Sequence, residues 1–136
     1  MSENAADVFF YGLFMDPDAL RAKGLQPRLP RKASVLGMAL RIGARATLVK
    51  QEGGVAHGVV MALSAEELKA LYAEPGVAAY QPEPVAAKGD DGTVIPAICY
   101  NLPHPEGGAP NAEYAVKLRI VAAKMGLPDS YIRSIR

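Results

Sequence analysis

Asp7-Val8-Phe9-Phe10-Tyr11-Gly12-Leu13-Phe14-Met15-Asp16-Pro17 combines the signals of a strand, a turn and a helix start in one short stretch. The run from Val8 to Tyr11 is apolar and rich in aromatic and β-branched residues, which is typical of a strand buried on both faces. Gly12 ends that run. Asp16 followed by Pro17 indicates a helix start, because Asp caps a helix well and proline suits the first helical position.

The turn at Gly12 has two interpretations. Successive N–H groups of such a turn can point at one spot, and a helix start adds positive potential there. The turn would then hold an anion or a carbonyl oxygen. It can equally be a tight turn with no ligand. These residues alone leave both interpretations open.

Length, charge and cysteine content narrow the class of protein. The chain has 136 residues, which fits a single domain over residues 7–136 after a disordered tail at 1–6. A formal net charge of +1 provides no electrostatic attraction for nucleic acid or an anionic membrane. Cys99 is the only cysteine, so no intrachain disulfide can form, and we expect a core thiol. Without a leader-like or membrane-spanning run, we expect a cytoplasmic protein.

The pattern of the chain predicts an α+β domain with five or six short strands. Several predicted strands are joined by turns too short for crossovers, so most of the sheet should be antiparallel. We expect a small barrel-like sheet surrounded by short helices. Gln26 to Lys32 is expected to be a loop, and Gly37 to mark a bulge. The predicted strands cover residues 8–11, 33–42, 46–50, 55–63, 80–87 and 93–102, with a hairpin between 46–50 and 55–63 turning at 52–54.

Three helices have recognisable start signals besides the one at Asp16. Ser64 and Glu67 form a capping box, and apolar residues follow at helical spacing. Asn111 can cap a helix from Ala112 to Lys124. A short terminal helix follows through Ile135, beginning near Pro128.

Glu74 contradicts its local context. It lies at the C-terminal end of the helix that starts at Ser64, where the dipole disfavours a carboxylate, and it precedes Pro75. Aromatic and apolar residues surround it in sequence. A carboxyl held among such groups would have a raised pKa and could transfer protons near neutral pH. The alternative is a solvent-exposed acid in a loop.

The other polar candidates are weaker. His57 lies in a predicted strand with no second ligand at metal spacing, and His104 lies between two prolines. Asp90 and Asp91 are expected to serve a turn. The sequence contains no nucleophile elbow and no phosphate-loop pattern.

In combination, these stretches resemble the γ-glutamylcyclotransferase-like family, which includes the AIG2-like proteins. Tyr11 to Pro17 is similar to the family's Tyr-Gly loop, and Gly58 to Leu71 to its strand and following helix. Glu74 to Tyr80 resembles the segment that bears the family's catalytic Glu and a pocket Tyr. Pro110 to Tyr114 and Gly126 to Tyr131 resemble its C-terminal helix and tail.

The resemblance implies a small barrel ringed by helices and a cyclisation reaction. A γ-glutamyl amine or peptide would form 5-oxoproline as its own α-amino group attacks the γ-carbonyl, so the enzyme mainly orients the reactants. Glu74 would be the catalytic acid and base. No metal or organic cofactor is implied. Substrate-binding residues would be Tyr11, Gly12, Leu13, Phe14, Met15 and Tyr80, with main-chain N–H groups as donors worth about 3–4 kcal/mol.

Two departures bear on the substrate. Leu13 stands where the family has Ser or Thr, and Phe14 where it has a polar Asn. Pro75 directly after Glu74 is also unusual. The substrate is then more apolar than glutathione, or the domain no longer turns over.

Three functions therefore stay open. The first is a γ-glutamyl cyclotransferase with a small-molecule substrate, and the second is a catalytically silent AIG2-like binding module. The third is a protein-interaction domain that exposes apolar residues such as Phe14; a homodimer is left open as well. Neither nucleic acid nor membrane is expected as a partner.

Overall fold

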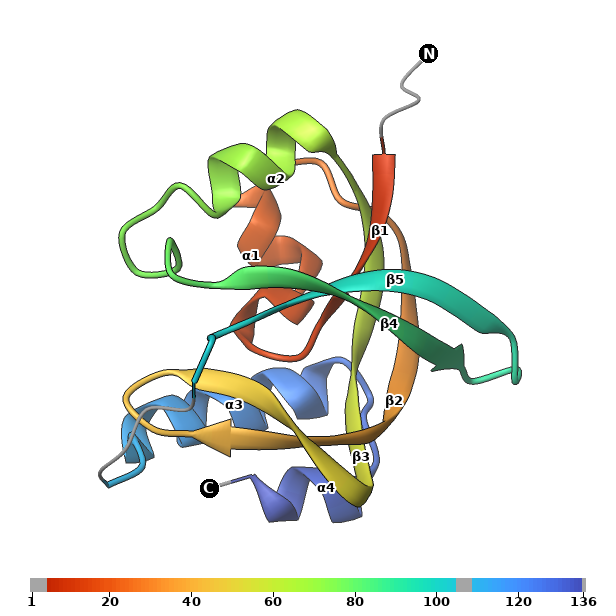
Figure 1. Cartoon of the computed structure of the whole chain (residues 1–136), viewed down its shortest axis with the longest axis vertical. Helices are drawn as coiled ribbons and strands as arrows, with labels where there is room; N and C mark the ends of the chain where they lie inside the picture. The colour runs from red at the N-terminus through yellow and green to blue at the C-terminus, as the bar shows by residue number, and fades with distance from the viewer. Residues whose placement is uncertain (1–4, 105–108, 136) are drawn as a thin grey trace.

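The computed structural model describes residues 5–104 and 109–135, and these form a closed five-stranded barrel (Figure 1). The barrel order is β1-β3-β2-β4-β5. Only the closing pair, β1 with β5, is parallel among the described pairings. The predicted barrel-like, mostly antiparallel α+β fold is confirmed. The strands are β1 (Ala5–Phe10), β2 (Arg28–Ile42), β3 (Ala46–Ser64), β4 (Gln81–Gly89) and β5 (Val94–Asn101).

Short helices surround the barrel (Figure 1). A single 3-10 turn, η1, and α1 follow β1, while α2 links β3 to β4. The two C-terminal helices lie side by side across the barrel from α2. The bounds are η1 (Leu13–Met15), α1 (Pro17–Arg21), α2 (Ala65–Leu71), α3 (Ala112–Lys124) and α4 (Asp129–Ser134).

The predicted helix starts are confirmed by their caps. The Ser64 hydroxyl accepts from the Glu67 N–H at 3.1 Å, and the Glu67 carboxylate accepts from the Ser64 N–H at 2.8 Å. The Asn111 side chain accepts from the Tyr114 N–H at 3.0 Å. Asp16 caps α1 by accepting from the Asp18 N–H at 3.0 Å. Each cap satisfies an N–H that has no partner inside its helix.

The predicted hairpin around Gly53 is wrong. Residues 46–64 form one long strand, β3, whose hairpin partner is β2, and the turn lies at residues 43–45. The register jumps from Leu36 opposite Val55 to Met38 opposite Lys50, so Gly53 lies in a bulge inside the strand. In the sequence, the pair Gly53-Gly54 resembles a turn because glycine supplies the positive φ that bulges and turns both use. In the structure, Gly53 has a φ of +77°.

Two further boundaries differ from the expectation. Ala5 and Ala6 belong to β1 and pair with β3, so the tail is shorter than residues 1–6; residues 1–4 lie outside the described part of the chain. The expected loop from Gln26 to Lys32 is strand from Arg28 onward. Pro30 is tolerated there because the register of β2 is irregular between Arg28 and Arg31.

The core has two parts, and β1 contributes to both. Phe9 and Tyr11 point into the barrel, whereas Val8 and Phe10 pack between the barrel and the helices. All four are at most 6% exposed, which confirms that this strand is buried on both faces. Leu20, Leu63 and Leu118 complete the outer part of the core.

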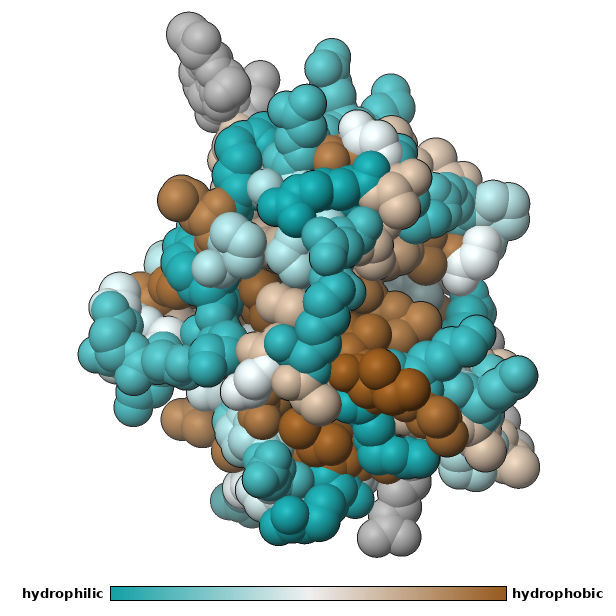
Figure 2. Space-filling view, turned by 180° about the vertical axis from the view of Figure 1, so that it is seen from behind, coloured by the Kyte–Doolittle hydropathy of each residue, from teal (hydrophilic) through white to brown (hydrophobic). Residues whose placement is uncertain are grey.

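The rear of the molecule carries apolar side chains on the face where α3 lies (Figure 2). On α3, Val116 is 48% exposed and Ile120 is 65% exposed. Within the described residues, no helix has the length and apolar character needed to cross a membrane.

Candidate active site

A cavity of about 200 Å³ opens where β1 runs into η1. Five segments far apart in the sequence contribute to its wall: the end of β1 with η1, the start of β3, the link after α2, β5 and α3. The described lining residues are Phe9, Phe10, Tyr11, Gly12, Leu13, Phe14, Arg45, Ala46, Tyr72, Gly76, Val77, Tyr80, Tyr100 and Tyr114.

Most of the predicted binding residues meet at this cavity. The cavity is lined by Tyr11, Gly12, Leu13 and Phe14. Tyr80, which lies in the link between α2 and β4, lines it as well. Phe14 is half-buried and packs against the core, so it is not the freely exposed contact residue of the interaction hypothesis.

Met15 is a correction to the predicted site. Its side chain is fully buried in the outer core, and it is not among the described residues that line the cavity. The 3-10 turn explains the difference. The Met15 N–H donates to the Gly12 carbonyl at 3.0 Å, which turns the third residue after Gly12 back into the protein.

The bend at Gly12 is held against Tyr114 of α3. A Cβ at Gly12 would lie 2.6 Å from the Tyr114 hydroxyl, so only glycine leaves room for it. The Leu13 N–H also acts on this phenol, because it lowers the pKa of the Tyr114 hydroxyl. One of the main-chain donors that the sequence suggested therefore already faces a hydroxyl group.

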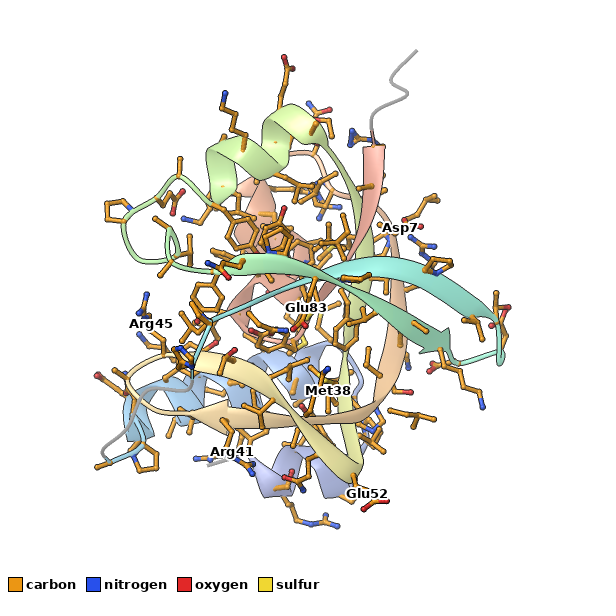
Figure 3. The ribbon with its side chains drawn as sticks, in the orientation of Figure 1. Asp7, Met38, Arg41, Arg45, Glu52 and Glu83 are labelled. Atoms are coloured by element: carbon orange, nitrogen blue, oxygen red, sulfur yellow. The ribbon has the colours of Figure 1, made fainter. Side chains whose placement is uncertain are left out.

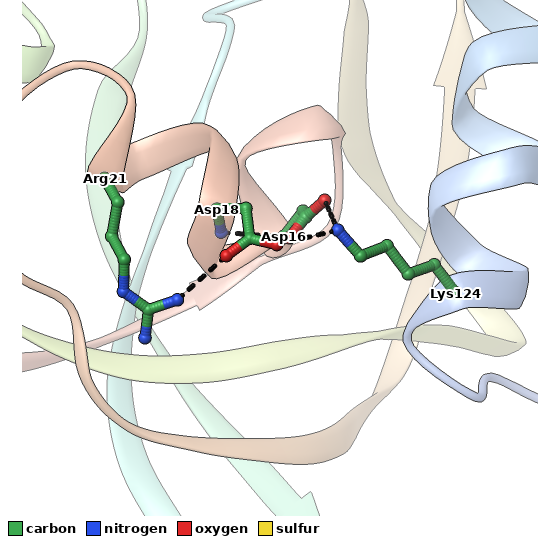
Figure 4. A network of polar contacts seen from close by, with 4 residues as sticks. All are labelled: Asp16, Asp18, Arg21 and Lys124. Carbon is green, nitrogen blue, oxygen red and sulfur yellow. Dashed lines mark hydrogen bonds and ion pairs between the residues drawn. The ribbon is translucent and has the colours of Figure 1, made fainter.

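Ion pairs stabilise the segment after the Gly12 bend on its outer side (Figure 4). Lys124, at the end of α3, lies 2.8 Å from the Asp16 carboxylate and 3.0 Å from that of Asp18. Arg21 binds the other oxygen of Asp18 at 3.0 Å. Asp16 is only 13% exposed, so its ion pair is better shielded than a surface pair. These contacts tie η1 and α1 to α3 and fix the rim of the cavity.

Tyrosine side chains dominate the cavity wall. The Tyr11 hydroxyl donates to the Tyr100 carbonyl at 2.8 Å, and the Tyr80 hydroxyl donates to the Ala46 carbonyl. The Tyr72 and Tyr100 rings are stacked, with centroids 3.8 Å apart and an interplanar angle of 11°. The sequence analysis gave Tyr72 and Tyr100 no role in the site. Five of the chain's six tyrosines lie in this wall, and no local pattern in the sequence brings them together.

The wall is electrically neutral where these phenols lie. Burial raises the pKa of Tyr11, Tyr72 and Tyr100. Burial also raises the pKa of Tyr114, an effect partly offset by the nearby Leu13 N–H. The four hydroxyls therefore stay protonated at neutral pH and can donate hydrogen bonds.

Arg45 is the charged residue of the described wall. Figure 3 shows it at the turn between β2 and β3, below the link between α2 and β4. It donates to the Gly76 carbonyl at 3.2 Å, and its guanidinium lies 5.8 Å from the Tyr80 ring centroid. Among the residues that the structure describes, no acidic side chain lines this cavity.

Glu74 differs from the expectation of an acid enclosed by apolar groups. Its side chain is 43% exposed, and its carboxylate lies 2.7 Å from the Lys23 ammonium. It is not a lining residue, although Tyr72 before it and Gly76 after it both are. The helix ends at Leu71, and the link then turns, with the Val77 N–H donating to the Glu74 carbonyl at 3.0 Å. The Glu74 carboxylate therefore lies outside the described lining of the cavity, paired with Lys23.

The remaining polar candidates lie elsewhere. The His57 ring packs edge-on against Tyr131, with centroids 4.7 Å apart. Cys99 is fully buried in the barrel, as predicted. Across residues 5–104 and 109–135, no group of three or more His, Cys, Asp or Glu side chains is arranged to hold a metal ion.

The sequence matches the family model described as γ-glutamyl cyclotransferase, AIG2-like, over residues 8–117. The chain belongs to this family. The match begins within β1, includes the Gly12 bend and Glu74, and ends within α3. No curated protein sequence matches the chain.

Solved structures share the fold of this γ-glutamyl cyclotransferase-like domain. A γ-glutamyl cyclotransferase superposes with a TM-score of 0.84 at 20% identity, covering 97% of this chain and 88% of that one. An uncharacterized protein from Homo sapiens gives 0.84 at 20% identity, covering 98% and 89%. A γ-glutamyl cyclotransferase specific to glutathione from yeast gives 0.68 at 15% identity, covering 98% and 94%. At these identities the likeness establishes the fold.

Proposed function

We propose that this domain binds a small γ-glutamyl amide in the cavity and cyclises it to 5-oxoproline, with release of the amine. The observation that supports the proposal is that Glu74 belongs to the link after α2, and residues on both sides of it in this link line the cavity. The Lys23 ammonium that binds Glu74 also lies 5.5 Å from the Phe14 ring centroid. The acid and Phe14 of the Gly12–Phe14 bend thus both contact the Lys23 side chain.

The reaction needs little covalent chemistry from the protein. The α-amino nitrogen of the γ-glutamyl group attacks its own γ-carbonyl carbon, so a new C–N bond closes the five-membered ring. The original amide C–N bond then breaks, and the amine leaves. Because the nucleophile is part of the substrate, the protein has to hold it in a reactive conformation and move one proton.

Glu74 would move that proton. Its carboxylate accepts a proton from the substrate's ammonium group and later donates it to the leaving amine. The second proton that the ring nitrogen loses passes to the released amine, which leaves as an ammonium ion. To do so it must turn from Lys23 toward the cavity. Exposed ion pairs of this kind contribute about 0–1 kcal/mol, so the rotation costs little.

The developing negative charge on the γ-carbonyl oxygen would be met at the Gly12 bend. The Leu13 N–H lowers the pKa of the Tyr114 hydroxyl against the effect of burial, and a phenol polarised in this way is a stronger donor through its own proton. We therefore assign Tyr114, backed by Leu13, as a donor to that oxygen. Removal of such a donor typically slows a reaction about 10²–10³-fold.

Product analysis tests the proposal. The protein is incubated with γ-glutamyl amines, γ-glutamyl amino acids and glutathione, and the products are followed by NMR. Cyclisation predicts 5-oxoproline and free amine in equal amounts. Release of glutamate would indicate hydrolysis instead, and absence of product from every compound would overturn the proposal.

A silent binding module is the second candidate. It is favoured by the absence of an acid among the described lining residues and by the pairing of Glu74 with Lys23. It predicts that 5-oxoproline or a γ-glutamyl amide raises the melting temperature without being converted. It also predicts equal binding by Glu74→Gln. Loss of turnover of a bound compound in that variant would exclude this candidate.

A further inference from the structure

The composition of the cavity wall points to the kind of amine that the substrate carries. Eight of the fourteen described lining residues are aromatic, and one, Arg45, is charged. Arg45 already donates to the Gly76 carbonyl and lies over the Tyr80 ring. A charged amine part would add a further charge to those of the γ-glutamyl group, and burying it in such a wall without a partner of opposite charge would cost several kcal/mol.

The aromatic rings are held in place by one another. Tyr72 is stacked on Tyr100 at 3.8 Å, and Phe14 meets Phe10 edge-on with centroids 6.5 Å apart. Side chains fixed in this way offer flat apolar surfaces that lose little further freedom when a ligand binds. They suit a planar or apolar group that packs by stacking and by edge contacts.

Phe14 and the proposed acid share one contact, the Lys23 ammonium. The Lys23 ammonium lies 2.7 Å from the Glu74 carboxylate and 5.5 Å from the Phe14 ring centroid. The leaving amine must reach the Glu74 carboxylate to take its proton. The amine part of the substrate therefore lies on the side of the cavity where Phe14 is.

We propose that the cavity selects γ-glutamyl amides whose amine part is aromatic, and that Phe14 is the residue that determines this specificity. The inference rests on the proposed function and deepens it by naming the leaving group. A ring in place of a charged amine part buries apolar surface against Phe14 and adds no further charge to the cavity.

The test compares two substrates in the same protein sample. We expect kcat/KM for γ-glutamyl benzylamide to exceed that for γ-glutamyl glycine by about 10–100-fold, the range that a hydrophobic pocket achieves for small differences in its ligand. Phe14→Asn should reduce this ratio about tenfold, and Phe14→Leu should give an intermediate value. Leu29→Asn, an apolar-to-polar change at a residue that is 69% exposed and outside the cavity, should leave the ratio unchanged.

Each outcome is decisive. The ratio of two substrates does not depend on how much of a variant is folded, so partial unfolding of Phe14→Asn does not obscure it. Equal or greater turnover of the glycine compound, or an unchanged ratio in Phe14→Asn, would overturn the specificity and leave the cyclotransferase intact. If neither compound nor any other γ-glutamyl amide gave 5-oxoproline, the proposed function itself would fail.

Discussion

The Tyr114 hydroxyl lies 2.6 Å from the point where a Cβ at Gly12 would be, and among the described residues other than the chain neighbours of Gly12, no second side chain comes within 4 Å of that point. Gly12 has a φ of −107°, so alanine suits the backbone and the hydroxyl is the obstacle. We expect Gly12→Ala to lower the free energy of unfolding by about 1–3 kcal/mol, the usual cost of overpacking. Chemical denaturation measures this.

A second substitution separates this contact from a general effect of alanine. Tyr114→Phe removes the hydroxyl and leaves the ring carbon at 4.0 Å, an ordinary contact. In the Tyr114→Phe background, Gly12→Ala should therefore cost less than about 0.5 kcal/mol. Equal costs in both backgrounds would show that the hydroxyl is not what requires glycine.

Glu67 should make stability depend on pH. Burial raises the pKa of the Glu67 carboxyl. Hydrogen bonds from the Ser64 and Gln26 N–H groups, together with the charge of Arg28, lower this pKa by more than burial raises it, so the net shift is downward. The unfolded chain then binds the proton more tightly, so this stabilisation is complete above about pH 5 and is lost as the pH falls through the pKa of the folded state.

Glu67→Gln should cost about 1–2 kcal/mol at pH 7, because one N–H loses its acceptor. The cost should shrink when urea denaturation is repeated near pH 3. Glu66→Gln, at an exposed neighbour on the same helix, serves as the control and should show no loss at either pH. A cost for Glu67→Gln that is the same at both pH values would contradict this account.

Cys99 should be unreactive in the folded protein. Burial raises the pKa of its thiol to about 12, and the charge of Glu83 adds to this effect. At pH 8 a disulfide reagent should label the native protein about a thousandfold more slowly than the protein in guanidinium chloride, because the thiolate is scarce and enclosed. Rapid labelling while the circular dichroism stays native would disprove the enclosure of the thiol.

Lys23 should compete with the substrate for Glu74. Since their ion pair is exposed and worth up to about 1 kcal/mol, Lys23→Met should lower KM by at most about fivefold and leave kcat near that of the parent. Steady-state kinetics measure both constants, with the exposed Lys69→Met as the control. A kcat reduced tenfold or more would mean that Lys23 holds the carboxylate in its working position.

The sequence was most informative where a signal is local. The capping residues Ser64, Asp16 and Asn111 fixed three helix starts, and the apolar run after Asp7 identified a strand buried on both faces. The bulge at Gly37 was predictable because a glycine inside a strand pattern often marks a bulge. In the structure, Gly37 has a φ of +81°. By contrast, Gly53 carries the same local signal, and only its pairing across β2 distinguishes a bulge from a turn.

The site was predictable in part for the same reason. The bend from Tyr11 to Phe14 is one continuous segment, so its residues were found together. The surroundings of Glu74 depend on where Lys23 passes, 51 residues away in the chain, and no local pattern reveals that. Tyr100 and Tyr114 reach the cavity from a strand and a helix that the sequence placed correctly, but only the tertiary arrangement shows which way they face.

The most direct test of the proposed chemistry is the rate of 5-oxoproline release by the parent, Glu74→Gln and Glu66→Gln. The parent is given in turn each γ-glutamyl amide that it binds. We predict a kcat for Glu74→Gln about 10²–10⁴-fold below that of the parent, and a kcat for Glu66→Gln within twofold of it. A Glu74→Gln variant as fast as the parent, or a parent that binds these amides without releasing 5-oxoproline, would contradict the role of Glu74.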